Sequence, residues 1–215
     1  MTDKAQQIRK AAERLFAAGR YHEVTLDDVC KKAGVGKGTV YRYFKDKEDL
    51  FWQVIAFGQN ELATSVEAVA REETDPSVGL RKAVVCVAEF FRDRQNLFRL
   101  VWSEQLRDAN RRRSMHRRWG TRDEKVISVV SGFIAQGIEQ VDYETDLSPV
   151  AAARLLLGMV RTALRHRSIM PEGSCPTESV IGLFEKGLLT RAGSRAKSRR
   201  TAAVRSVGRS EPGGS

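Results

Sequence analysis

The 215-residue sequence has few cysteines, and their spacing excludes the usual cysteine-based sites. Cys30, Cys86 and Cys175 are odd in number and far apart, and no CxxC pair is present. We therefore expect no zinc site and no disulfide framework. Small buried thiols in a reducing cytoplasm are the simplest interpretation of the three residues.

The sequence also lacks a long apolar run. The first residues contain no apolar segment of the kind that forms a signal peptide, and the most apolar stretch, near residues 150–160, is interrupted by Arg154. A membrane-spanning helix needs about 20 consecutive apolar residues. We therefore expect a cytoplasmic protein with no membrane partner.

Motifs for catalysis are likewise missing. The stretch from Gly36 to Thr39 superficially resembles a phosphate-binding loop, but position 31 is Lys rather than Gly, and Gly38 stands where Ser or Thr would bind magnesium. His22 and Glu23 lack the second histidine of a zinc-protease motif. With no nucleophile–base pair or metal-ligand cluster either, the sequence predicts no enzyme, catalytic residue, cofactor or metal site.

Basic residues are abundant, and the formal net charge of +10 favours a polyanionic partner, such as nucleic acid or an anionic membrane surface. Residues 191–215, however, contain seven basic residues and one acidic residue, which supply +6 of that charge. This segment has too few apolar residues to form a core, and we expect a disordered basic tail. A second basic cluster, at 111–118, is typical of a solvated helix face, with anion or DNA binding as the alternative.

Apolar residues recur at spacings of three and four along most of the chain, which predicts an all-α fold of about nine helices. Thr25 and Asp46 are suitable N-caps, and Pro76 and Pro149 suit first helical turns. The expected helices cover approximately 3–18, 25–33, 37–44, 47–71, 76–91, 97–106, 127–138, 149–168 and 177–190.

Two short expected helices flank Gly34-Val35-Gly36, a spacing typical of a helix-turn-helix. Gly34 can adopt the left-handed conformation that ends the first helix, and Val35 can fill the corner between the two. On a helical wheel, Val40 and Phe44 of the second helix point inward. Cationic and hydroxyl-bearing side chains and a glycine point outward or sideways, which suits insertion into the major groove: Gly38, Thr39, Tyr41, Arg42 and Lys45.

Residues Thr25 to Leu50 resemble the DNA-binding domain of the tetracycline-repressor (TetR) family, and the resemblance extends over about residues 8–55. It rests on Thr25, Ala-Gly-Val at 33–35, Gly-Thr-Val-Tyr-Arg-Tyr-Phe at 38–44 and Lys-Glu-Asp-Leu at 47–50. Gly36 departs from the serine cap of many members, but glycine is an acceptable cap. Together with the wheel, the resemblance predicts eight DNA-binding residues: Thr25, Lys37, Gly38, Thr39, Tyr41, Arg42, Tyr43 and Lys47.

The resemblance further implies a homodimer with a C-terminal domain for ligand binding and dimerisation. We expect a DNA-binding domain at 1–46, a helical domain at 47–190 and the tail at 191–215. Helix-spaced aromatics are more often core residues, yet the resemblance implies that some large apolar residues line the effector pocket: Phe90, Phe98, Trp102, Trp119, Phe133 and Met159. The expected dimer interface contains Leu156, Val160, Ala163, Ile181, Phe184 and Leu188.

The predicted function is therefore sequence-specific regulation of transcription, in which a repressor leaves its double-stranded operator when a small-molecule effector binds. The alternative is a DNA-binding regulator with no small-molecule ligand, controlled by a partner protein or by cysteine oxidation. The sequence itself does not identify the operator, the effector or the genes controlled.

Overall fold

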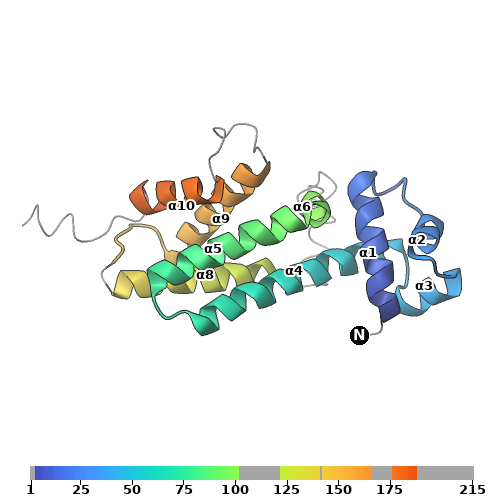
Figure 1. Cartoon of the computed structure of the whole chain (residues 1–215), viewed down its shortest axis with the longest axis horizontal. Coiled ribbons are helices and arrows are strands. Elements are labelled where there is room, and N and C mark those ends of the chain that lie inside the picture. Colours follow the sequence, from blue (N-terminus) through green and yellow to red (C-terminus); the bar gives the residue numbers. More distant parts are fainter. Residues whose placement is uncertain (1–2, 102–121, 141, 166–175, 188–215) are drawn as a thin grey trace, which may run out of the picture. The chain divides into compact units, whose positions relative to one another are not determined.

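The computed structural model describes residues 3–101, 122–140, 142–165 and 176–187, and within these ranges it contains nine α-helices (Figure 1). They are α1 (Asp3–Ala18), α2 (Leu26–Ala33), α3 (Lys37–Tyr43), α4 (Lys47–Glu72), α5 (Pro76–Asp93), α6 (Gln95–Val101), α8 (Arg122–Glu139), α9 (Pro149–Arg165) and α10 (Pro176–Gly187). The predicted all-α fold is confirmed.

The chain divides into two compact units. One contains Met1–Glu72 and Val85–Val126, and the other contains Glu73–Val84 and Ile127–Ser215. The boundaries fall inside α5 and α8, so each of these helices contributes to both units. The domain division expected at residue 46 remains a prediction, and the expected tail at 191–215 lies outside the described residues.

The first unit is built around α1, which packs against α2, α3, α4 and α6 (Figure 1). Phe16 of α1 is 1% exposed, and its ring meets the ring of Phe51 of α4 edge-on, with centroids 5.1 Å apart. Val40 and Phe44, predicted to point inward, are 0% and 1% exposed and belong to the same core. The start of α4 and Leu100 of α6 complete this core, which therefore extends beyond residue 46.

The helices begin where their capping residues predict. The Asp46 carboxylate accepts a hydrogen bond from the Asp49 amide at 2.7 Å, and α4 begins at the next residue. Asp75 accepts from two amides of α5, whose first residue is Pro76. A side-chain acceptor at each helix start satisfies amides that have no partner within the helix.

The second unit is held together by apolar packing and by polar contacts between distant segments. α9 packs against α10, and the guanidinium of Arg81 in α5 pairs with Glu178 and Glu185 of α10. The hydroxyl of Tyr143 donates a hydrogen bond to Ser77 Oγ at 2.8 Å. These contacts join the beginning of α5 to elements that follow it by 60 or more residues.

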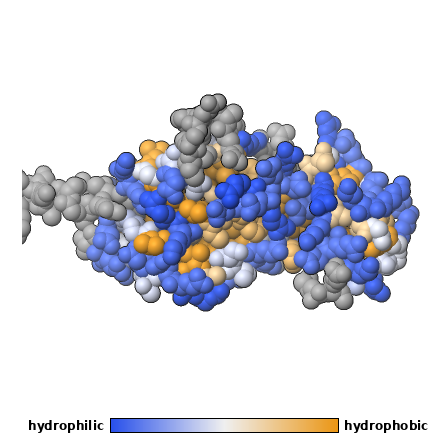
Figure 2. All heavy atoms as spheres, viewed as in Figure 1, coloured by the Kyte–Doolittle hydropathy of each residue, from blue (hydrophilic) through white to orange (hydrophobic). Residues whose placement is uncertain are grey.

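Polar side chains cover much of the visible surface, with apolar patches between them (Figure 2). Among the described residues, no helix has both the length and the apolar character that a membrane-spanning segment needs.

Two aromatic residues near the end of α3 provide a test of this core. Replacing Phe44 with Ala removes a fully buried ring, and we expect it to lower the free energy of unfolding by about 3–5 kcal/mol. Tyr41, which is 57% exposed, is the matched control, and Tyr41→Ala should change stability by less than about 0.5 kcal/mol. Urea unfolding followed by circular dichroism measures both. Equal effects of the two substitutions would contradict the assigned faces of α3.

Candidate nucleic-acid interface

The first helix of the candidate motif begins at a reciprocal cap. Thr25 Oγ1 accepts a hydrogen bond from the Asp28 amide at 3.2 Å, and the Asp28 carboxylate accepts from the Thr25 amide at 3.0 Å. The Thr25 hydroxyl also donates to the Asp28 carboxylate at 2.6 Å, and this bond, followed by the one from the Thr25 amide, lowers the pKa of Asp28. The capping role predicted for Thr25 is confirmed, and the box fixes the exposed hydroxyl at the start of α2.

The turn between α2 and α3 has the predicted geometry. Gly34 has φ 63° and ψ 37°, the left-handed conformation that is unfavourable for residues with a Cβ atom. The Val35 amide donates to the Cys30 carbonyl at 3.1 Å, and the Val35 side chain packs against the core. Gln7 of α1 donates a side-chain hydrogen bond to the Ala33 carbonyl at 2.8 Å, which ties this turn to α1.

The exposed face of α3 carries most of the predicted contacts. Lys37, Gly38, Tyr41 and Arg42 are exposed, whereas Thr39 and Tyr43 are half-buried. Arg42 lies over the ring of Tyr43, with the guanidinium carbon 5.1 Å from the ring centroid. The structure thus places six predicted residues on one short helix, and their contact with DNA remains a prediction.

A carboxylate that the sequence reasoning did not assign orients Lys37. Asp27 of α2 lies 2.7 Å from Lys37 Nζ, and its hydrogen bond and charge raise the pKa of Lys37. Because both side chains are more than half exposed, the pair is screened by solvent and is weak. The ten-residue separation across the turn explains why helical spacing alone did not reveal it.

Lys47, predicted to bind DNA, has its amino group on backbone carbonyls of the chain itself. Its Nζ donates to the backbone carbonyls of Tyr21 and Val24 at 3.0 and 2.9 Å, and to that of His22 at 3.4 Å. It also lies 4.6 Å from the centroid of the Tyr21 ring. The position of this lysine in the first turn of α4 is therefore explained by the carbonyls of the segment that precedes Thr25.

Two glycines at the start of α3 have space around them. A Cβ atom added to Gly36 or to Gly38 would meet no other atom within 4 Å. Packing within the chain therefore does not require glycine at Gly38, a position on the exposed face of α3. The missing side chain leaves room for another molecule to approach the helix.

The predicted effector-pocket residues fall in both units. Phe90 and Phe98 are half-buried in the first unit, each with its ring against that of Phe91. Phe133 is 4% exposed in the second unit, where it fills the space beside Gly79, and Met159 is half-buried there. Trp102 and Trp119 lie outside the described residues. Pocket roles for the set remain a prediction.

The predicted dimer-interface residues that the structure describes are buried within a single chain. Leu156, Val160, Ala163, Ile181 and Phe184 are at most 3% exposed within a single chain. They therefore offer little surface to a partner, and their role in a dimer interface remains a prediction. Leu188 lies outside the described residues. Helical spacing identified the apolar faces correctly, but it did not distinguish packing inside the chain from packing between chains.

The described residues contain no group of three His, Cys, Asp or Glu side chains arranged to hold a metal ion.

Cys30 is buried. Burial, with a smaller contribution from Glu89, raises the pKa of the half-buried Cys86, which disfavours the reactive thiolate. Cys175 lies outside the described residues.

The amino-acid sequence matches the family described as "Bacterial regulatory proteins, tetR family" over residues 8–54. It is 22% identical over 157 residues to the fatty acid metabolism regulator protein of Bacillus subtilis (strain 168), which covers 73% of this chain and 79% of that protein. The fold is similar to that of the fatty acid degradation regulator FadR from Bacillus halodurans, with a TM-score of 0.74 and 21% identity over 87% of this chain and 97% of the other. FadR from Bacillus subtilis in complex with stearoyl-CoA gives a TM-score of 0.73 and 21% identity over 85% and 98%.

Two glycine substitutions test the geometry of the turn and of α3. Gly34→Ala places a Cβ atom at a left-handed residue and should lower the free energy of unfolding by about 1–2 kcal/mol. Gly38→Ala is the matched control, because it adds the same methyl group in a helix with open space around it. It should leave stability unchanged or raise it by about 0.5 kcal/mol. Urea unfolding measures the difference, and a destabilising Gly38→Ala with a neutral Gly34→Ala would refute this assignment.

Proposed function

We propose that this chain is a member of the tetR family of bacterial regulatory proteins, whose model matches residues 8–54, and that it regulates transcription by inserting α3 into the major groove of an operator. The observation that carries the proposal is the division of α3 into two faces. Val40 is fully buried, while the opposite face presents Lys37, Tyr41 and Arg42 to solvent. A buried face fixes the orientation of the helix, and the polar face offers donors suited to base edges and phosphates.

The residues around α3 have distinct proposed roles. Lys37 and Tyr41 contact DNA from the exposed face of the helix, and Gly38 allows the backbone to approach the groove. The Thr25 hydroxyl and the amides at the start of α2 suit a phosphate of the DNA backbone. Asp27 holds Lys37 beside the turn until an acceptor on the DNA takes the place of Asp27. Breaking the Asp27–Lys37 pair costs little free energy, because both side chains are exposed.

For Lys47 we propose a positioning role in place of direct phosphate contact. Its three carbonyl acceptors lie in the segment that connects α1 to the Thr25 cap. Holding this segment against α4 sets the location of the Thr25 hydroxyl relative to α3. The lysine then supports DNA binding through the backbone that it restrains.

We propose that the regulator is a homodimer, because two recognition helices about 34–36 Å apart would reach successive major grooves. The interface that we propose uses the outer faces of α9 and α10. Leu155 and Leu183 are 49% and 63% exposed, so each helix offers a partner an apolar side chain. Beside them, Cβ atoms at Gly158 and Gly182 would meet nothing within 4 Å, so a partner helix has room to approach closely.

The effector is proposed to act by population shift. A small molecule that prefers a dimer with a different spacing of recognition helices weakens operator binding, and the operator weakens effector binding equally. Repression is the proposed default output. Long-chain acyl-CoA thioesters are the first class to test, since FadR of Bacillus subtilis was solved with stearoyl-CoA. Control by oxidation is less well supported, because Cys30 is buried and the pKa of Cys86 is raised.

The DNA-binding face is tested with an operator that the full chain selects from a pool of random duplexes. Lys37→Ala and Tyr41→Ala should each weaken binding about tenfold and together about 100-fold, because each removes a contact worth about 1–3 kcal/mol. Lys82→Ala is the control, since Lys82 is also exposed and lies 2.7 Å from a carboxylate, that of Glu73. Fluorescence anisotropy should give a Kd within about twofold of wild type for this control. Undiminished binding by the double variant would exclude α3 as the reading helix.

The dimer surface is tested by adding charge to it. Leu155→Arg combined with Leu183→Arg should convert the dimer to a monomer at micromolar concentration, because buried unpaired guanidinium groups oppose association. Val78→Arg changes another exposed apolar residue of the same unit and should leave the dimer intact. Sedimentation velocity distinguishes the species. A double variant that remains dimeric would place the interface elsewhere.

A further inference from the structure

The first unit contains a cavity of about 550 Å³ that the proposed function does not use. It lies among α1, α4 and the segment that connects α5 to α6, on the side of α1 that does not belong to the candidate DNA-binding face. Most of its lining side chains are polar or charged: Gln6, Arg9, Lys10, Glu13, Arg14, Val54, Phe57, Glu61, Arg92, Asp93, Arg94, Gln95 and Asn96.

Arg9 is the unusual member of this lining. Its side chain belongs to α1, and the residue is only 5% exposed, although it carries a charge. Nε and Nη2 are fully buried and donate to no acceptor among the described residues. The guanidinium carbon lies 4.4 Å from the centroid of the Phe57 ring, a cation–π contact that offsets only part of the cost of removing the charge from water. Burial accordingly lowers the pKa of Arg9, and the charge of Glu61 opposes this shift.

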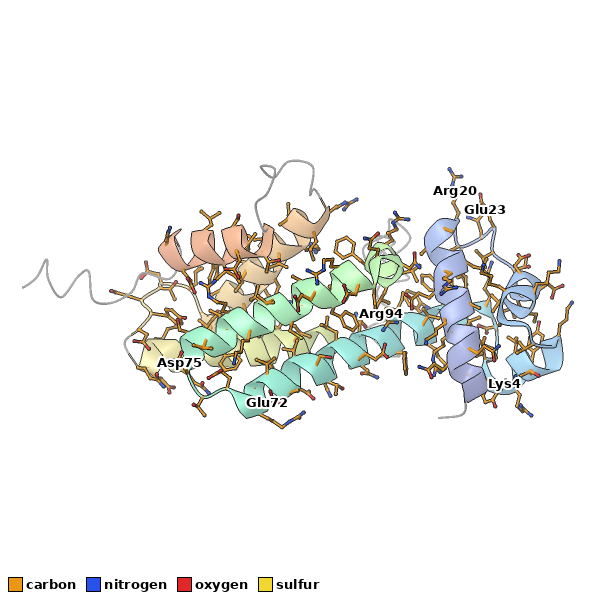
Figure 3. All side chains as sticks on the ribbon, in the orientation of Figure 1. Lys4, Arg20, Glu23, Glu72, Asp75 and Arg94 are labelled. Carbon is orange, nitrogen blue, oxygen red and sulfur yellow. The ribbon has the colours of Figure 1, made fainter. Side chains whose placement is uncertain are left out.

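The carboxylates around the cavity are already engaged by other arginines. Arg94, labelled in Figure 3, is the single residue between α5 and α6. It pairs with Glu13 of α1 at 2.9 Å and with Glu61 of α4. Burial lowers the pKa of Arg94, but the bonds and charges of Glu61 and Glu13 outweigh burial, so the net pKa is raised. Asp93 lies 3.5 Å from Arg92. None of these carboxylates makes a hydrogen bond with Arg9.

The charges of the lining therefore leave an excess of cations. Five basic and three acidic side chains line the cavity, a formal net charge of +2. After Arg92 and Arg94 are paired, the remaining basic residues are Arg9 in the interior and Lys10 and Arg14 at the exposed rim. Lys10 and Arg14 are four residues apart on α1 and so lie on one face of the helix.

We propose that this cavity binds a small anion through a carboxylate or phosphate group, with Arg9 as its central contact and Lys10 and Arg14 at the entrance. A guanidinium forms charge-assisted hydrogen bonds with the oxygens of either group. A volume of about 550 Å³ accommodates a small metabolite. The bound anion adds negative charge and a hydrogen-bond acceptor beside Arg9, and it stabilises the folded state by mass action.

The site also has a structural consequence. α1 is the central helix of the core that positions α2 and α3, and the Arg94 pairs already join it to α4 and to the start of α6. An anion held by Arg9, Lys10 and Arg14 adds a contact on the same side of α1. Anion binding needs neither DNA nor the effector, so it stands or falls independently of the proposed regulatory function.

The test measures thermal unfolding of the full chain in increasing sodium phosphate or sodium succinate, against sodium chloride at equal ionic strength. We expect a saturable rise in Tm with at least one of the two anions and none with chloride. A response to phosphate alone identifies a phosphate ligand, and a response to succinate alone identifies a carboxylate. Absence of any rise beyond chloride with both anions would overturn the proposal.

Variants assign the response to the cavity. Arg9→Leu should fold, because an apolar side chain suits a buried site, and it should abolish the rise in Tm. Arg20 is an exposed arginine that follows α1 and points away from it (Figure 3). Arg20→Leu is the matched control and should respond as wild type does. Calorimetry measures the affinity for the anion. Arg9→Lys should weaken it about tenfold, and Arg14→Gln should weaken it a few-fold. Full affinity in Arg9→Leu, or in both Arg9→Lys and Arg14→Gln, would overturn the assignment.

Discussion

The chain changes direction between α2 and α3 within three residues, and the left-handed backbone at Gly34 makes this reversal possible. Two amides of the turn bond back to the last carbonyls of α2, so the end of that helix is satisfied while the next one begins. Val35 packs into the corner, and Val40 and Phe44 bury the inner face of α3. The orientation of every exposed side chain on α3 follows from these constraints.

The same core reaches further along the chain than the motif. Phe51 of α4 and Leu100 of α6 share it with Phe16 of α1, so the helices that follow the candidate DNA-binding residues contribute to holding them. Lys47 and Arg94 add polar connections, one to the backbone before α2 and the other between α1 and α4. A displacement of α4 or α6 would therefore also displace α1. The proposed coupling between effector and DNA requires such a connection.

Local features were predictable from the sequence, and features that join distant segments were not. Gly34, Thr25 and Pro76 act through their own backbone or through amides a few residues away, and the structure has each where its residue type predicts. Arg9 and Lys47 depend on segments brought together only by folding, so helical spacing gave no indication of their surroundings. The apolar stripes on α9 and α10 were visible in the sequence, but burial within one chain and burial between chains produce the same pattern.

The central claim is that the α2–α3 face meets DNA, and amide hydrogen exchange of the full chain tests it most directly. The comparison is between free protein and protein bound to its selected duplex. The account predicts slower exchange on binding at residues 25–29 and 36–43, where the amides lie at or beside the proposed contacts. Unchanged exchange in both segments, with protection elsewhere in the chain, would contradict it.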